Sequence, residues 1–102
     1  LDTMGMHQIG EFKFELQHIP GHSPGSLVFI FEENGFGIVG DVIFKGSVGR
    51  TDLPNGSHTD LMQGIYDYIV PLPGDLVLFP GHGGPTTVQQ ESDTNPFLNG
   101  RR

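Results

Sequence analysis

Hydrophobic and polar residues alternate with a period of two over residues 11–18. Phe12, Phe14 and Leu16 fall on one side and charged or amide residues on the other, which predicts a half-buried β-strand. Residues 26–32 form a nearly continuous apolar run, which is typical of a strand buried on both faces. Glu33, Asn34 and Gly35 then predict a tight turn, with a returning strand over residues 36–39.

The periodicity changes to that of a helix in the second half of the chain. Apolar residues recur at helical spacing from residue 61 to residue 69, after Ser57 or Thr59, either of which can cap the helix. Pro71 and Pro73 are expected to end it. The preceding segment, residues 45–57, holds three glycines and a proline and is expected to be a long ordered loop.

Three short elements are predicted for the C-terminal third of the chain. Residues 76–79 are expected to form a buried strand, and Thr86 or Thr87 is expected to cap a short helix that runs through Ser92. Residues 95–98 are expected to form a tail that docks an apolar pair. The whole order indicates an α+β fold, with a mostly antiparallel sheet and one to two covering helices. Such a sheet is left partly open, as in half of a layered fold.

Composition limits the classes of function. The 102 residues carry a net charge of −7 and no cysteine, which argues against nucleic-acid binding, an anionic membrane surface, disulfides and thiolate metal ligands. No stretch is apolar enough to predict a membrane span, and the lack of cysteine fits a cytoplasmic protein. Because residue 1 is leucine, we expect that an upstream part is missing.

Three candidate ligands stand where predicted strands meet glycine-rich loops: His22, Asp41 and His82. Imidazole and carboxylate groups are the usual protein ligands of zinc, iron and manganese. Each residue has an alternative interpretation. His22 competes with His18 and could cap a nearby amide, and Asp41 could cap a turn. For His82, set among three glycines, a purely structural role is harder to find.

The loop after Asp41 carries three further charged residues. Lys45 and Arg50 are two of only five basic residues, and beside the candidate site they could hold an anionic substrate group. Two structural alternatives stay open. Lys45 could be an ordinary solvated charge, and Arg50 could pair with Asp52 to fix the loop.

These motifs together resemble the metallo-β-lactamase superfamily, and within it the single-domain bacterial hydrolases related to glyoxalase II. The matching stretches are His-Ile-Pro-Gly-His-Ser-Pro-Gly-Ser at 18–26, Gly-Asp-Val-Ile-Phe-Lys-Gly-Ser-Val-Gly-Arg-Thr-Asp-Leu-Pro at 40–54, Pro-Gly-His-Gly-Gly-Pro-Thr-Thr at 80–87 and Asn-Pro-Phe-Leu at 95–98. They lie in the family's order across nearly the whole chain. The resemblance implies half of a four-layer αβ/βα sandwich.

The resemblance also implies roles for individual residues. His22 would complete the histidine set of a first metal, Asp41 would bridge both metals as the catalytic carboxylate, and His82 would belong to the second metal. Arg50 would lie near the substrate, and Lys45 stays a second substrate-binding candidate from its place in the loop. The implied reaction is thioester hydrolysis, in which a metal-bound hydroxide attacks the carbonyl of a small-molecule thioester, such as one derived from glutathione. Two divalent ions are implied, zinc first, with iron or manganese as alternatives.

One family signature is absent. No segment matches His-x-His-x-Asp-His, which supplies four ligands in the superfamily. Residues 1–102 therefore resemble the C-terminal half of such a domain, and we expect this chain to be inactive alone. Two alternatives stay open: a mononuclear-iron persulfide dioxygenase of the same fold, and a non-catalytic half that self-associates or needs the missing N-terminal half.

Overall fold

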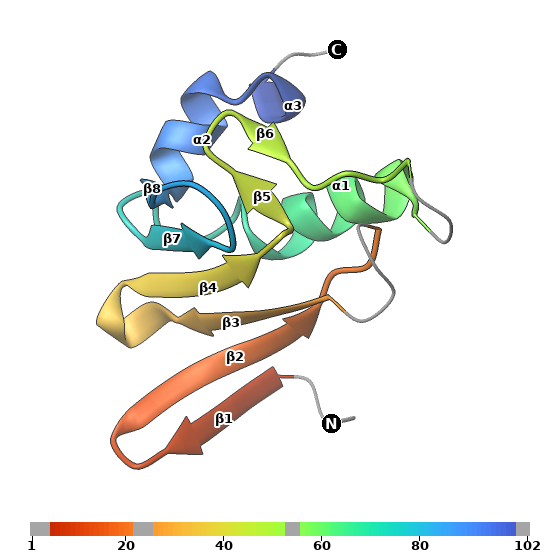
Figure 1. Ribbon diagram of the computed structural model, residues 1–102. Coiled ribbons are helices and arrows are strands. Elements are labelled where there is room, and N and C mark those ends of the chain that lie inside the picture. Colours follow the sequence, from red (N-terminus) through yellow and green to blue (C-terminus); the bar gives the residue numbers. More distant parts are fainter. Residues whose placement is uncertain (1–4, 22–25, 53–55, 100–102) are drawn as a thin grey trace.

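A six-stranded sheet dominates the computed structural model, which describes residues 5–21, 26–52 and 56–99. Its strand order is β1-β2-β3-β4-β7-β8 (Figure 1). The strands are β1 (Gly5–Ile9), β2 (Phe12–His18), β3 (Leu27–Phe31), β4 (Phe36–Gly40), β7 (Val77–Pro80) and β8 (Thr86–Thr87). Every pairing is antiparallel except that of β4 with β7. The predicted α+β class and mostly antiparallel sheet are confirmed.

Three parts of the strand structure differ from the sequence prediction: β1, the β5–β6 hairpin and β8 (Thr86–Thr87), where only a helix cap was expected. β1 was not expected, and it forms because its backbone pairs along β2 from Gly5↔Leu16 to Ile9↔Phe12. The loop predicted over residues 45–57 is wrong in its first part, since β5 (Ile43–Phe44) pairs with β6 (Ser47–Val48). Only two residue pairs make this small hairpin, so local patterning gives little signal for it. The turn after β3 is a short 3₁₀ helix, η1 (Glu32–Asn34), that ends at Gly35 with φ +82°.

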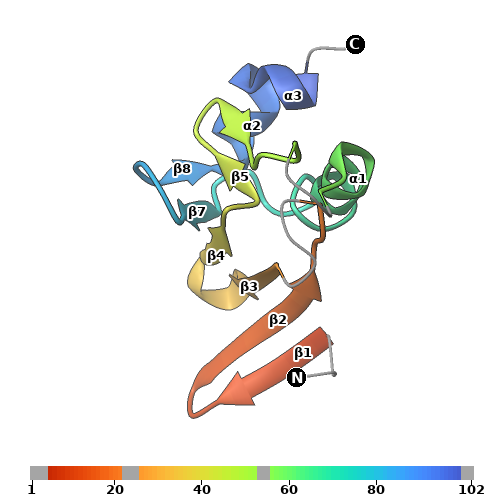
Figure 2. The same ribbon diagram turned by 45° about the vertical axis from the view of Figure 1, so that its right-hand side comes forward.

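Three helices accompany the sheet. α1 (His58–Tyr68) begins at its Ser57 cap, whose hydroxyl accepts a hydrogen bond from the Asp60 amide at 3.2 Å. Thr87 caps α2 (Val88–Thr94) in the same way, and α3 (Pro96–Asn99) follows it. Figure 2 shows α1 to one side of the sheet and α2 with α3 at its far end. In the described part of the chain, no helix is long and apolar enough to cross a membrane.

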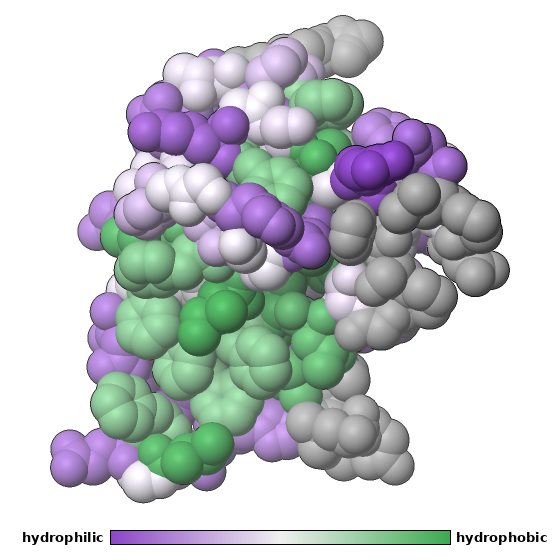
Figure 3. Space-filling view, in the orientation of Figure 1, coloured by the Kyte–Doolittle hydropathy of each residue, from purple (hydrophilic) through white to green (hydrophobic). Residues whose placement is uncertain are grey.

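The sheet face away from α1 is aromatic. Six of the eight phenylalanines lie on it, and the large apolar area in Figure 3 covers these strands: Phe12, Phe14, Phe29, Phe31, Phe36 and Phe79. We call this set the aromatic face. Its rings touch in sequence, with centroids 4.8 Å apart for Phe31 and Phe36 and 5.9 Å apart for Phe36 and Phe79.

The expectation that the run 26–32 is buried on both faces is therefore wrong. Val28 and Ile30 are buried against α1, but Phe29 and Phe31 are only partly covered. The run is uniformly apolar in sequence because phenylalanines occupy the aromatic face. No described element lies over that face.

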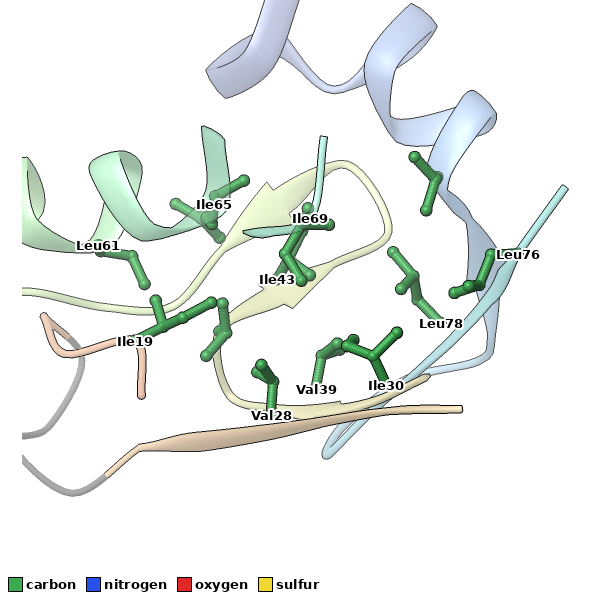
Figure 4. Packing of buried hydrophobic residues seen from close by; sticks show 13 residues of the cluster. Ile19, Val28, Ile30, Val39, Ile43, Leu61, Ile65, Ile69, Leu76 and Leu78 are labelled. Atoms are coloured by element: carbon green, nitrogen blue, oxygen red, sulfur yellow. The ribbon is translucent and has the colours of Figure 1, made fainter. Parts of the chain in front are cut away.

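The opposite face carries an aliphatic core. Leu61, Ile65 and Ile69 from the α1 region meet side chains of β3, β4 and β7, all pointing toward one another (Figure 4). Helix and loop touch closely at Gly64, where an added Cβ would lie 2.5 Å from Ile19 Cγ2. Burial on this face supplies the main stabilisation of the described fold.

The C-terminal segment also differs in detail from the predicted tail. Asn95 is fully buried and precedes α3, so residues 95–98 are not an extended tail. Leu98 packs against the core, whereas the Phe97 side chain is 45% exposed, so only one of the two apolar residues docks.

Candidate functional site

Asp41 and His82 meet at one edge of the sheet. Asp41 follows β4 and His82 follows β7, and these neighbouring strands are parallel, with Gly40 opposite Pro80. Carboxyl ends of parallel strands face the same edge, which is where open sheets of this kind bind ligands. His82 Nδ1 lies 3.0 Å from Asp41 Oδ1. The structure thus brings together two of the three candidate ligands.

Two glycines permit this approach. Gly40 has φ +53°, a backbone conformation that favours glycine, and its carbonyl accepts a hydrogen bond from the Gly81 amide at 2.8 Å. A Cβ at Gly81 would lie 2.9 Å from Asp41 Oδ1. Any side chain there would displace the carboxylate, so the glycines around the two ligands position the pair.

The Asp41–His82 pair opens into a pocket of about 410 Å³. Its walls include Lys45 and Arg50, the two residues predicted from the sequence to bind substrate. The full lining is Asp41, Phe44, Lys45, Arg50, His82 and Gly83. The pocket therefore combines a carboxylate and an imidazole with two cationic side chains, an arrangement suited to an anionic molecule.

Arg50 pairs with Asp52, which confirms one of the two alternatives given for Arg50 from the sequence. Its guanidinium donates to the Asp52 carboxylate from Nε at 3.1 Å and from Nη2 at 3.3 Å. The pair raises the pKa of Arg50 and lowers the pKa of Asp52, mainly through these hydrogen bonds. Arg50 still faces the pocket, so pairing and pocket lining are compatible.

His22, the third candidate ligand, lies outside the described residues. Its predecessor Gly21 is fixed at the start of α1, because its carbonyl accepts a hydrogen bond from the Ser57 amide at 2.8 Å. A Cβ at Gly21, where φ is +130°, would lie 2.5 Å from Leu61 Cβ. The competing residue His18 ends β2 and is exposed.

Sequence reasoning missed one wall of the pocket. Phe44 and Gly83 line it, and the Phe44 ring centroid lies 6.0 Å from that of His82. Ile43 points into the core and Phe44 out of it. This two-residue alternation is too short to have identified Phe44 in advance.

The donor set fits a metal ion in part. Residues 5–21, 26–52 and 56–99 contain no group of three or more potential ligands. Asp41 and His82 nevertheless offer one carboxylate and one imidazole, a combination that divalent zinc, iron and manganese accept. Their side chains are 37% and 79% exposed, so both donors can be reached from the pocket.

Comparison with known proteins decides the family. A sequence model described as the metallo-beta-lactamase superfamily matches residues 7–82, which include Asp41 and His82. The chain belongs to this superfamily. Residues 41 and 82 thus lie within the region that the family model matches.

Two curated relatives cover nearly the whole chain. The Haemophilus influenzae protein "Hydroxyacylglutathione hydrolase GloC" is 44% identical over 90 residues, which are 88% of this chain and 42% of that protein. "Probable metallo-hydrolase YqgX" of Bacillus subtilis is 43% identical over 94% of this chain and 46% of its own length. The chain spans somewhat less than half the length of these relatives.

Solved structures agree in fold. BLEG-1, titled a B3 metallo-beta-lactamase, matches 98% of the chain and 48% of its own with a TM-score of 0.92 and 45% identity. TTHA1623, crystallised in a di-iron-bound form, matches 94% of the chain and 46% of its own with a TM-score of 0.84 and 41% identity. ETHE1 from Myxococcus xanthus, at 24% identity and a TM-score of 0.85 over 95% of the chain and 45% of its own, shows the shared fold alone.

Proposed function

We propose that this chain contributes to a metal-dependent hydrolase of small anionic thioesters, of the hydroxyacylglutathione hydrolase type. The observation that carries the proposal is the Asp41–His82 pair, set at 3.0 Å in a pocket that also presents Lys45 and Arg50. The relative named hydroxyacylglutathione hydrolase, at 44% identity, supports the thioester.

Asp41 and His82 would hold divalent metal ions together with His22 and ligands from elsewhere in the protein. We propose two ions, zinc first, and the di-iron form of TTHA1623 keeps iron as an alternative. When bound, such ions polarise a carbonyl and lower the pKa of water, which is the chemistry that thioester hydrolysis needs. Gly81 contributes by leaving room for the Asp41 carboxylate.

Lys45 and Arg50 would bind and orient the substrate. A glutathione thioester carries carboxylates at some distance from its reacting carbonyl, and cations on the pocket wall can hold such groups. Phe44 supplies an apolar surface beside His82 for the uncharged part of the substrate. Asp52 keeps the Arg50 guanidinium in one orientation through two hydrogen bonds.

The test uses the natural protein that carries this chain, in its full length. Hydrolysis of S-D-lactoylglutathione is expected, and Lys45→Ala should raise KM roughly three- to tenfold with a smaller change in kcat. Lys13→Ala is the matched control, because Lys13 of β2 is also exposed but lies near Glu33 of η1 and does not line the pocket. Oxygen consumption on glutathione persulfide without thioester hydrolysis would instead identify a dioxygenase and contradict the proposal.

A second role follows from the aromatic face. Contiguous apolar surface of this kind usually marks an interface, and Phe12, Ile38 and Phe79 are 44–50% exposed. Because the relatives are about twice as long as this chain, we propose that the rest of a metallo-beta-lactamase domain covers the face. By sedimentation, the 102-residue chain alone should then self-associate, with negligible thioesterase activity. A monomeric, active chain would contradict this role.

A further inference from the structure

Glu91 of α2 is a buried carboxylate that does not line the pocket. Glu91 is 1% exposed. Its two carboxylate oxygens accept three hydrogen bonds. The Gly46 amide and Asn95 Nδ2 each donate to Oε1 at 2.9 Å, and the Thr86 hydroxyl donates to Oε2 at 2.5 Å. A buried carboxylate is tolerated only when it is satisfied in this way, so these contacts define its position.

Asn95 extends the network to the β5–β6 hairpin. It is fully buried, and its Nδ2 donates to the Ser47 carbonyl at 3.0 Å and approaches the Phe44 carbonyl at 3.4 Å. Together with the bond from the Gly46 amide to Glu91, these contacts fix both sides of the hairpin turn. In both ribbon views α2 lies next to this hairpin (Figures 1 and 2).

The turn needs such an anchor because its own pairing is short. Only Ile43↔Val48 and Phe44↔Ser47 pair between the two strands, and an isolated hairpin of this size is marginal at best. The same carboxylate also binds Thr86, which begins the strand that follows the His82 loop. Glu91 therefore ties the segment after Asp41 to the segment after His82.

We infer that Glu91 and Asn95 are positioning residues for the pocket wall made by Phe44 and Lys45. The inference about geometry stands on the contacts alone, and its consequence for substrate binding rests on the proposed function. Removing the carboxylate leaves the Gly46 amide and the buried Thr86 hydroxyl without this acceptor, and leaves Asn95 Nδ2 only the hairpin carbonyls. This loss should release the turn while the aliphatic core under α1 stays intact.

Amide hydrogen exchange in the full-length natural protein tests the geometry. In Glu91→Leu, protection of the Gly46 amide should fall about tenfold more than protection of the α1 amides. Glu91→Gln should keep most of it, because its carbonyl can accept from Gly46 and Asn95 while the Thr86 hydroxyl turns to accept from the new amide. Unchanged Gly46 protection in Glu91→Leu, or an equal loss in Glu91→Gln, would overturn the inference.

Ile65→Val is the control for general destabilisation. Ile65 is fully buried in the core under α1, so its shortening should lower protection of Gly46 and of the α1 amides by the same factor.

Steady-state kinetics on S-D-lactoylglutathione test the consequence. Glu91→Leu should raise KM more than it lowers kcat, and Glu91→Gln should restore KM, because the displaced groups, Phe44 and Lys45, face the substrate. A released Gly46 amide with an unchanged KM would overturn the positioning of the wall. If the wild-type protein hydrolyses no thioester, the proposed function fails, and the exchange experiment still decides the geometry.

Discussion

The two faces of the six-stranded sheet are both apolar, but a described element covers only one of them. Val28, Ile30 and Leu78 lie in the aliphatic core with at most 1% exposure. On the aromatic face, Phe12 and Phe79 are 50% and 44% exposed. The covered face holds most of the buried apolar side chains, although Phe14 and Leu16 on the other face are also buried. The rest of the open face carries apolar surface that a further partner would use. Apolar side chains that are buried stabilise the fold, whereas equally apolar side chains that stay exposed form a surface for an interface.

The largest expected effect is on the covered face. Leu61→Ala should lower the free energy of unfolding by about 2–5 kcal/mol, because Leu61 is fully buried and its loss leaves a cavity. Phe12→Ala on the aromatic face should cost less than about 1 kcal/mol in the 102-residue chain, measured at a dilution where the chain is monomeric. Urea denaturation of both variants checks the difference, and equal losses would mean that the aromatic face is already buried in this chain.

A smaller change in the free energy of unfolding is expected for Gly64→Ala, and its sign is opposite to that of an ordinary glycine-to-alanine change in a helix. Alanine normally stabilises an exposed helix by about 1 kcal/mol relative to glycine. At this position the new Cβ would lie 2.5 Å from Ile19 Cγ2, so Gly64→Ala should destabilise the chain. In the double variant with Ile19→Ala, the total loss should be smaller than the sum of the two single losses, because the clash is removed. A stabilised Gly64→Ala would show that the contact between helix and loop is loose.

The element pattern was predictable from the sequence and the second side of the sheet was not. Alternation gave β2, and the helical spacing around Leu61 gave α1, because each is a local property of a long enough segment. Period two assigns residues to opposite faces but does not say what covers each face. For that reason, the aromatic face was expected to be buried along residues 26–32.

The candidate site divides in the same way. Glycine-rich loops after strands marked Asp41 and His82, and the parallel β4–β7 pairing brings them together. Glu91 and Asn95 gave no comparable signal, since a glutamate and an asparagine near the end of a chain are usually solvated. Their role depends on tertiary contacts with residues more than forty positions away.

The smallest expected effect concerns the exposed Arg50–Asp52 pair. Because the pair lowers the pKa of Asp52, its contribution to stability is present above the ordinary aspartate pKa of 3.8 and is lost as the pH falls through the lowered value. Asp52→Asn should remove this acid dependence and leave the fold intact. Thermal unfolding between about pH 2 and pH 5 at low salt checks it. An unchanged pH profile would show that the pair adds nothing to stability.

The central claim, that the pair at the edge of the sheet binds metal, is tested most directly by metal analysis of the full-length natural protein. His82→Ala should lose metal selectively from one of two ions, while circular dichroism stays that of the wild type, because the His82 side chain is 79% exposed and supports no core contact. Lys13→Ala, remote from the pocket, should keep the full content. A His82→Ala protein that retains the wild-type metal content would contradict the account.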